Sequence, residues 1–178
     1  MHTSGNSDAY RFSGKVGVWL LMITIAILFG ALSLAYMTAG NSPVNFSIPW
    51  GFYANTFILV LSSVMLHYGW LHRHRAGKRV MLRPAVLLGL LFLGSQVFAW
   101  YQLYQHGMDI SQSGQKVSYL YLLTGLHAAH LIGGIGFLLY VWATYQRKGQ
   151  QYLETAVYFW HFLGILWVYL LCVLVANA

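Results

Sequence analysis

The stretch VGVWLLMITIAILFGALSLAYMT, residues 16–38, carries no charged residue and exceeds the roughly 20 helical residues that cross a bilayer core of about 30 Å. Four further apolar runs follow, at residues 50–71, 84–104, 117–145 and 155–176. Of the 178 residues, 58% are hydrophobic and only 7% are charged, against about 25% charged residues in an ordinary soluble domain. The sequence therefore predicts an all-α integral membrane bundle of five transmembrane helices.

The polar segments between these runs are too short to form a separate soluble domain. We therefore expect residues 15–178 to be a single five-helix domain. Residues 1–14 are polar and precede the first run, so we expect them to form an N-terminal cytoplasmic tail without regular structure.

The Lys and Arg residues favour one side of the predicted bundle. If the N-terminus is inside, Lys116 is the only one of the ten in an outer segment. Because inner segments of membrane proteins are enriched in Lys and Arg, we predict that the N-terminus is inside and the C-terminus outside. The net charge of +7 then reflects this bias and attraction to anionic inner-leaflet lipid, and nucleic-acid binding is not expected.

Polar side chains inside the apolar runs are the candidate functional residues, because leaving them unpaired in hydrocarbon is costly. At 100° per residue, Thr124, His127 and His130 share one helix face. On roughly the opposite face, small residues form a surface suited to close helix contact, namely Gly125, Ala129 and Gly133. The other candidates lie on the second, third and fifth runs, namely Asn55, Ser62, Ser63, His67, Ser95, Gln96, Glu154, Tyr158, Trp160 and His161.

The intramembrane histidines leave several chemical roles open. A metal site would lack a carboxylate or cysteine partner at membrane depth, and a proton relay would lack a carboxylate near the midplane. A b-type haem needs one or two facing histidines, which the sequence could supply from His67, His127, His130 and His161. Hydrogen bonding between helices is the commoner use of such residues, so we expect that role and keep the haem as the alternative.

Four motifs, in order along the chain, resemble subunit III of the haem-copper terminal oxidases. TGLHAAHLIGG, residues 124–134, resembles that subunit's Thr-Gly-x-His-x-x-His-x-x-x-Gly motif. LETAVYFWHFLGILWVYLL, residues 153–171, is similar to its last helix, with a Glu, an aromatic-Trp-His-Phe signature and a second Trp. IPWGFYANTFILVLSS, residues 48–63, resembles its Asn-Thr helix, and GSQVFAW, residues 94–100, stands where a Gln-x-x-Glu-Trp pattern is typical.

The resemblance implies an accessory subunit that binds no haem or copper, in the short form that lacks the first two helices of the seven-helix version. Such a subunit packs on subunit I, which holds haem and copper in the complex, and holds phospholipid in a cleft. It supports sustained oxygen reduction and proton uptake by a proton-pumping enzyme, here expected to be a cytochrome c oxidase of aerobic respiration. Subunit II, small subunits and a respiratory supercomplex would be further partners. The expected location is a bacterial inner membrane in preference to the mitochondrial one.

On this interpretation the polar residues are structural or interhelical, not catalytic, namely Asn55, Gln96, Thr124, His127, His130, Glu154, Trp160 and His161. The alternatives are subunit III of a quinol oxidase, a b-type haem membrane anchor and an assembly factor.

The chain also departs from the family pattern. Thr24 and Ile25 stand in place of an intramembrane Ser-Glu pair, and Ala99 stands in place of a Glu. Glu154 matches the pattern, and its position favours an ion pair over a lipid or proton contact.

Overall fold

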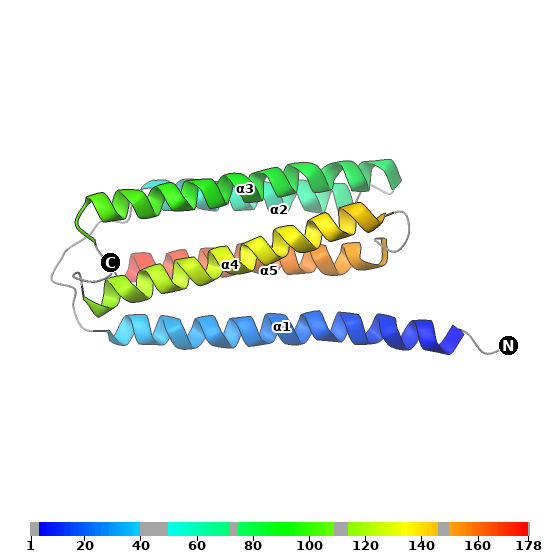
Figure 1. Cartoon of the computed structure of the whole chain (residues 1–178), viewed down its shortest axis with the longest axis horizontal. Coiled ribbons are helices and arrows are strands. Elements are labelled where there is room, and N and C mark those ends of the chain that lie inside the picture. The colour runs from blue at the N-terminus through cyan, green and yellow to red at the C-terminus, as the bar shows by residue number, and fades with distance from the viewer. Residues whose placement is uncertain (1–3, 40–49, 72–74, 109–113, 146–149, 178) are drawn as a thin grey trace.

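The described part of the chain consists of five α-helices and short connections (Figure 1). The computed structural model describes residues 4–39, 50–71, 75–108, 114–145 and 150–177, and within these ranges it contains no strand. The helices are α1 (Ser4–Thr38), α2 (Trp50–Leu71), α3 (Arg75–Gln105), α4 (Gln115–Thr144) and α5 (Gln150–Ala176). Each has a segment long and apolar enough to cross a membrane, so the predicted all-α fold with five transmembrane helices is confirmed.

Two helices begin earlier than the apolar runs predict. Helix α1 starts at Ser4, so the prediction of an irregular tail through residue 14 is wrong. Helix α3 starts at Arg75 and contains Pro84 inside it, not in its first turn. The membrane-spanning parts, Lys15–Thr38 and Leu82–Gln105, do lie close to the predicted runs. Once a helix has formed, each added residue gains a backbone hydrogen bond without the free-energy cost of starting a new helix. A helix can therefore extend past the membrane boundary that hydrophobicity marks.

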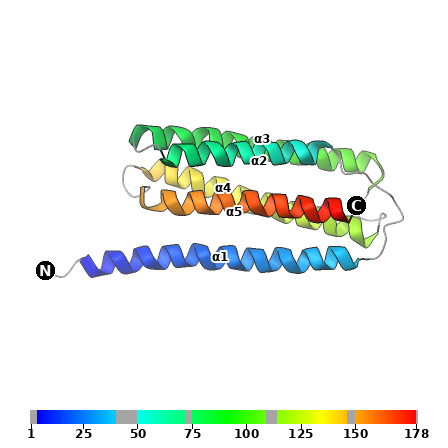
Figure 2. The ribbon, with the colours of Figure 1, turned by 180° about the vertical axis from the view of Figure 1, so that it is seen from behind.

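The helices form three layers (Figures 1 and 2). Helices α2 and α3 pack together on one side, α4 and α5 form the middle, and α1 contacts α4 and α5 on the other side. Helix α4 contacts α1, α3 and α5, and α5 contacts α1, α2 and α4, so these two helices form the centre of the bundle.

Helices that follow each other along the chain run in opposite directions, which places the two termini at opposite ends of the bundle (Figure 1). At one end α1, α3 and α5 begin and α2 and α4 end, and we call this the basic end. The basic residues that the topology prediction assigns to the inside lie in the first part of α1, in the first part of α3, and in the segments that join α2 to α3 and α4 to α5. The alternation of the helices thus brings the basic first parts of α1 and α3 to the same end of the bundle.

Bulky aromatic side chains fill the centre, and glycine makes room for one of them. Trp160 and Trp167 of α5 are almost completely buried. A Cβ atom added at Gly89 of α3 would lie 2.7 Å from Cη2 of Trp160 and 3.2 Å from Ile135. Only a residue without a side chain fits where the indole meets α3.

Gly125, Ala129 and Gly133 form the small-residue surface of α4. The prediction was that another helix packs closely on this surface, and among the described residues none does. A Cβ atom added at Gly125 or Gly133 would meet nothing within 4 Å among the described residues, and Ala129 is exposed. Helical periodicity shows which residues of α4 share a face. It does not show whether another helix of the same chain covers that face.

Candidate functional site

Buried amide groups join α2 and α3. The Asn55 side-chain Nδ2 donates a hydrogen bond of 2.9 Å to Oε1 of Gln96, and both residues are completely buried. The hydroxyl of Ser95 donates to Oδ1 of Asn55. Nε2 of Gln96 has no hydrogen-bond partner among the described residues. Because hydrocarbon offers no competing partner, a paired amide of this kind links the two helices in one register.

Indole N–H groups of α5 form a second set of contacts between helices. Trp160 Nε1 donates to the Ser62 hydroxyl of α2 at 3.1 Å, and Ser62 in turn donates to the backbone carbonyl of Ala85 in α3 at 3.2 Å. Trp167 Nε1 donates to the hydroxyl of Thr56 in α2, also at 3.1 Å. A single relay, through Trp160 and Ser62, therefore connects three helices.

A similar indole–hydroxyl bond connects α3 with α4. Trp100 Nε1 donates to the hydroxyl of Thr124 at 3.0 Å, and this hydroxyl donates to the Leu120 carbonyl one turn earlier at 2.8 Å. Trp100, Trp167 and Thr56 were not among the candidates. They could have been found from the sequence, because the N–H of a buried indole needs a hydrogen-bond acceptor. Hydroxyl side chains on other helices provide that acceptor.

His127 and His130 make no hydrogen bond to another helix within the described residues, in contrast to the interhelical role that the sequence predicted. His127 is completely buried, and neither ring nitrogen has a partner among the described residues. Its ring lies 5.1 Å from the Trp167 ring and 5.8 Å from the Phe92 ring, measured between centroids. His130 Nδ1 lies 2.7 Å from the Leu126 carbonyl of its own helix. The helices facing α4 present aromatic rings to His127, and rings offer packing surface instead of a strong acceptor.

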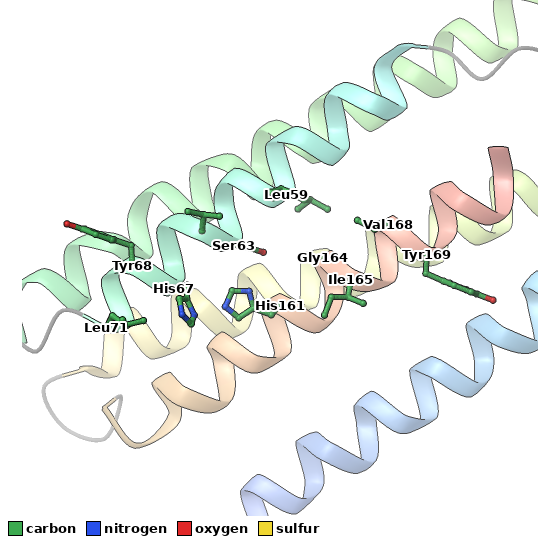
Figure 3. A pocket seen from close by; sticks show the side chains of 12 residues that line it. Leu59, Ser63, His67, Tyr68, Leu71, His161, Gly164, Ile165, Val168 and Tyr169 are labelled. Atoms are coloured by element: carbon green, nitrogen blue, oxygen red, sulfur yellow. The ribbon is translucent and has the colours of Figure 1, made fainter. Parts of the chain in front are cut away.

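His161 of α5 and His67 of α2 lie side by side in the lining of a groove of about 870 Å³ (Figure 3). The two ring centroids are 5.5 Å apart in an edge-to-face arrangement, and Nε2 of His161 is buried without a partner among the described residues. Apolar side chains line most of the groove, and Ser63, Tyr68 and Tyr169 add polar atoms.

Two pairs of histidines, His67 with His161 and His127 with His130, are not placed to ligate a haem from both of its faces. A haem ligated by both His67 and His161 would have to lie between the rings, which are in direct contact. His127 and His130 lie one turn apart on a single helix and cannot face each other across a macrocycle. In the described part of the chain, no three His, Cys, Asp or Glu residues come together in a group that could hold a metal ion.

Glu154 forms an ion pair at the basic end. Its carboxylate oxygen Oε2 lies 3.1 Å from Nζ of Lys15, which ties α5 to α1. The side chains keep 44% and 54% of their surface exposed, so solvent screens the attraction.

Two positions that depart from the family pattern, Ala99 and Ile25, carry buried apolar side chains. Ala99 is completely buried in α3, and its Cβ would lie 3.6 Å from a Cβ added at Gly51 of α2. Ile25, at the other departure from the family pattern, is also buried, and the Thr24 hydroxyl donates to the Leu20 carbonyl at 2.9 Å.

Comparison with known proteins supports the resemblance. No family model matches the chain. Over 189 residues it is 26% identical to a probable cytochrome c oxidase subunit 3 of Rickettsia conorii, and this alignment covers 88% of this chain and 64% of that protein. It is 33% identical over 121 residues to cytochrome c oxidase subunit 3 of Corynebacterium diphtheriae, covering 64% of this chain and 58% of that protein.

The similarity extends to a ubiquinol oxidase. The chain is 27% identical over 182 residues to cytochrome bo(3) ubiquinol oxidase subunit 3 of Pseudomonas aeruginosa, covering 94% of this chain and 83% of that protein. By contrast, it spans less than two thirds of the length of the Rickettsia conorii and Corynebacterium diphtheriae relatives. The predicted resemblance is confirmed: over most of its length, this multi-pass membrane protein is homologous to subunit 3 of the cytochrome c and ubiquinol terminal oxidases.

Proposed function

We propose that the chain is an accessory, cofactor-free subunit III of a proton-pumping cytochrome c oxidase in aerobic respiration. The observation that carries the proposal is similarity over 88% and 94% of the chain to subunit 3 of a cytochrome c oxidase and of a ubiquinol oxidase. A subunit common to enzymes with different electron donors is expected to support the catalytic subunit. It is not expected to handle the donor itself.

The use of polar groups inside the bundle supports a structural role. The amide contact of Asn55 with Gln96 and the indole contacts of Trp160, Trp167 and Trp100 are made between helices of this chain. Their donors and acceptors are engaged in tying helices together, as expected of a rigid scaffold. The chain would then stabilise subunit I and sustain oxygen reduction and proton uptake there.

The proposal includes partners on the outer faces of the bundle. Subunit I would be the main contact, with subunit II, small subunits, phospholipid and a respiratory supercomplex beyond it, and haem and copper would reside in those partner subunits. Helix α1 exposes many large apolar side chains, including Trp19, Leu20, Ile23 and Ile27. Surfaces of this kind suit lipid or a neighbouring membrane subunit.

We also propose a bacterial inner membrane as the location, with the N-terminus inside. The basic residues in the first parts of α1 and α3, two helices that begin at the same end of the bundle, support this orientation. A reporter that is active only outside the cytoplasm should be active when fused after Ala178. Activity of a cytoplasm-specific reporter at the same site would reverse the topology.

A quinol oxidase subunit III is the second candidate, because the Pseudomonas aeruginosa relative is part of such an enzyme. The two candidates differ in the donor that the whole complex oxidises. Purified complex should reduce oxygen with reduced cytochrome c if the first proposal is correct. Oxygen reduction with quinol alone would favour the second.

Purification through an affinity tag on this chain tests the accessory role. We expect subunits I and II in equimolar amounts, with haem and copper in the complex, and no Soret band from the chain once it is separated. A substoichiometric chain would instead indicate an assembly factor. A stoichiometric Soret band on the separated chain would indicate the haem anchor and refute the cofactor-free proposal.

A further inference from the structure

We propose that a groove between α1 and α4, at the middle of the membrane, binds the ring of an isoprenoid hydroquinone, with His130 accepting a hydrogen bond from its hydroxyl group. The groove has a volume of about 390 Å³, which is within the usual range of small-molecule sites. Side chains of α1, α4 and α5 line it, among them Leu21, His130, Phe137 and Phe159.

The hydrogen bonding of His130 leaves one ring nitrogen as an acceptor. Nδ1 lies 2.7 Å from the carbonyl oxygen of Leu126, one turn earlier in α4. Because a carbonyl oxygen only accepts, Nδ1 carries the proton of this bond, and in a neutral imidazole Nε2 then has a free lone pair. The described residues form no hydrogen bond to Nε2. The ring also contacts Phe29, with the centroids 5.6 Å apart, so the acceptor has a defined place.

His130 lies at a depth that lipid headgroups do not reach. The membrane-spanning part of α4 extends from Gln115 to Thr144, which places His130 at its centre, about 20 Å from either end at the rise of an α-helix. The hydrocarbon core is about 30 Å thick, so this position is close to the midplane. An acceptor without a partner is costly there, and this cost favours an occupant that donates a hydrogen bond.

The lining of the groove excludes water and an acyl chain as occupants that satisfy His130. Among the residues that line the groove, only His130 has a polar side chain. A buried water needs two to four polar partners, and an acyl chain has no donor. The lining therefore fits a molecule with one hydrogen-bond donor on an apolar body.

The shape of the groove favours an aromatic ring as that body. Ala129 and Gly133 leave the α4 side of the groove without bulky side chains. Phe137 and Phe159 meet edge to face, with centroids 6.5 Å apart, and aromatic rings pack well against such a pair. Leu21 is 49% exposed, so the groove opens toward the bilayer, where an isoprenoid tail can lie.

These requirements together identify a hydroquinone. Its phenolic O–H can donate to Nε2 of His130, whereas the oxidised quinone has only carbonyl oxygens at these positions and cannot donate. The choice of this ligand rests on the proposed place of the chain in a respiratory membrane, because such membranes contain hydroquinones. The site should therefore prefer the reduced form.

Binding of a short-chain ubiquinol by the full-length chain tests the site. The chain is purified alone in mild micelles, and decylubiquinol, decylubiquinone and the dimethyl ether of decylubiquinol are titrated separately without oxygen. We expect the quinol to bind about threefold to tenfold more tightly than the quinone or the ether, the factor that one hydrogen bond inside a membrane protein contributes. The assay needs neither haem nor a partner subunit, so its failure would leave the proposed oxidase function unaffected.

Two pairs of variants locate the site. His130→Leu should reduce the affinity for the quinol to that for the ether, and His130→Gln, whose amide oxygen can accept, should retain part of the difference. A Cβ atom at Gly133 or Gly125 would meet nothing within 4 Å among the described residues. Gly133→Leu fills the groove and should weaken binding at least about tenfold, because the ring loses its apolar contacts. Gly125→Leu makes the same change on the same face of α4 outside the groove and should leave binding unchanged.

Three results would contradict the proposal. Equal affinities of the unaltered chain for the quinol and its ether would show that Nε2 accepts no hydrogen bond, and this result does not depend on any variant. Equal losses from Gly133→Leu and Gly125→Leu, with helix content unchanged by circular dichroism, would place binding outside the groove. A photo-reactive side chain at position 133 should crosslink to quinol in the native membrane. Crosslinks only to another protein, or only to phospholipid, would assign the groove to that occupant instead.

Discussion

Replacing Gly89 by alanine should destabilise the bundle, although alanine is the better helix former. The added methyl carbon would lie 2.7 Å from Cη2 of Trp160 and 3.2 Å from Ile135. The indole is almost completely buried, and its Nε1 is held by the Ser62 hydroxyl. Because the ring cannot turn away without losing that bond, the helices must separate or Trp160 must adopt a strained rotamer.

Gly133→Ala is the matched control for this substitution. It makes the same chemical change in the middle of a membrane-spanning helix, but the new methyl group would meet nothing within 4 Å among the described residues. The gain in helix propensity, about 1 kcal/mol in water, is common to both variants and cancels in their difference. Overpacking a well-filled core costs about 1–3 kcal/mol. We therefore expect Gly89→Ala to be about 1–3 kcal/mol less stable than Gly133→Ala.

The free energy of unfolding can be measured for the isolated chain in mild micelles, by titration with a denaturing detergent and circular dichroism at 222 nm. Use of the isolated chain removes contacts that a partner subunit could make near Gly133. Equal stability of the two variants would refute the reasoning. It would show that Trp160 does not fill the space beside Gly89 as the structure has it.

Three further substitutions test other contacts by the same unfolding measurement. Ala99→Glu should cost at least about 3 kcal/mol, because it places a carboxyl group in a completely buried α2–α3 contact, and near-normal stability would contradict the packing there. Asn55→Leu should cost about 1 kcal/mol by leaving the Gln96 amide without its donor; adding Gln96→Leu should recover part of this loss, and strict additivity would argue against the bond. Glu154→Gln should cost less than about 1 kcal/mol, because its ion pair with Lys15 is half exposed, and a larger loss that salt does not reduce would point to another role.

Hydrophobicity alone was sufficient to predict the membrane-spanning segments. A bilayer imposes a minimum length and an apolar surface on each helix, and both properties are visible in the sequence. The helix starts at Ser4 and Arg75 were missed because outside the membrane only local backbone hydrogen bonding decides how far a helix continues. No hydrophobic signal marks that limit.

The partners of the polar residues could not be predicted in the same way. His127 and His130 are prominent in the sequence, yet what surrounds them depends on which side chains the neighbouring helices present. Trp160 was a candidate, but its acceptor Ser62 lies 98 positions away. A pairing over such a separation follows from the packing of α2 against α5, and a single sequence does not specify that packing. The grooves between helices were unpredictable for the same reason.

The family relationship was predictable because it depends on the order and spacing of motifs and not on side-chain contacts. The motifs follow in the expected order: first the Asn-Thr helix, then the motif around Thr124 and His127, and then the last helix from residue 153. The comparisons with known subunits confirm the relationship. At Ala99, where the chain departs from the pattern, the structure adds what the sequence could not show, namely that this side chain is completely buried in α3.

Oxygen consumption by the purified oxidase, measured per haem with and without this chain during continuous turnover, tests the accessory role most directly. We predict that the enzyme lacking the chain starts at a rate close to that of the complete enzyme and then loses activity over successive turnovers, while the complete enzyme stays active. If the enzyme without the chain keeps all its haem and copper yet reduces no oxygen from the first turnover, the chain has a direct chemical role and the account is wrong.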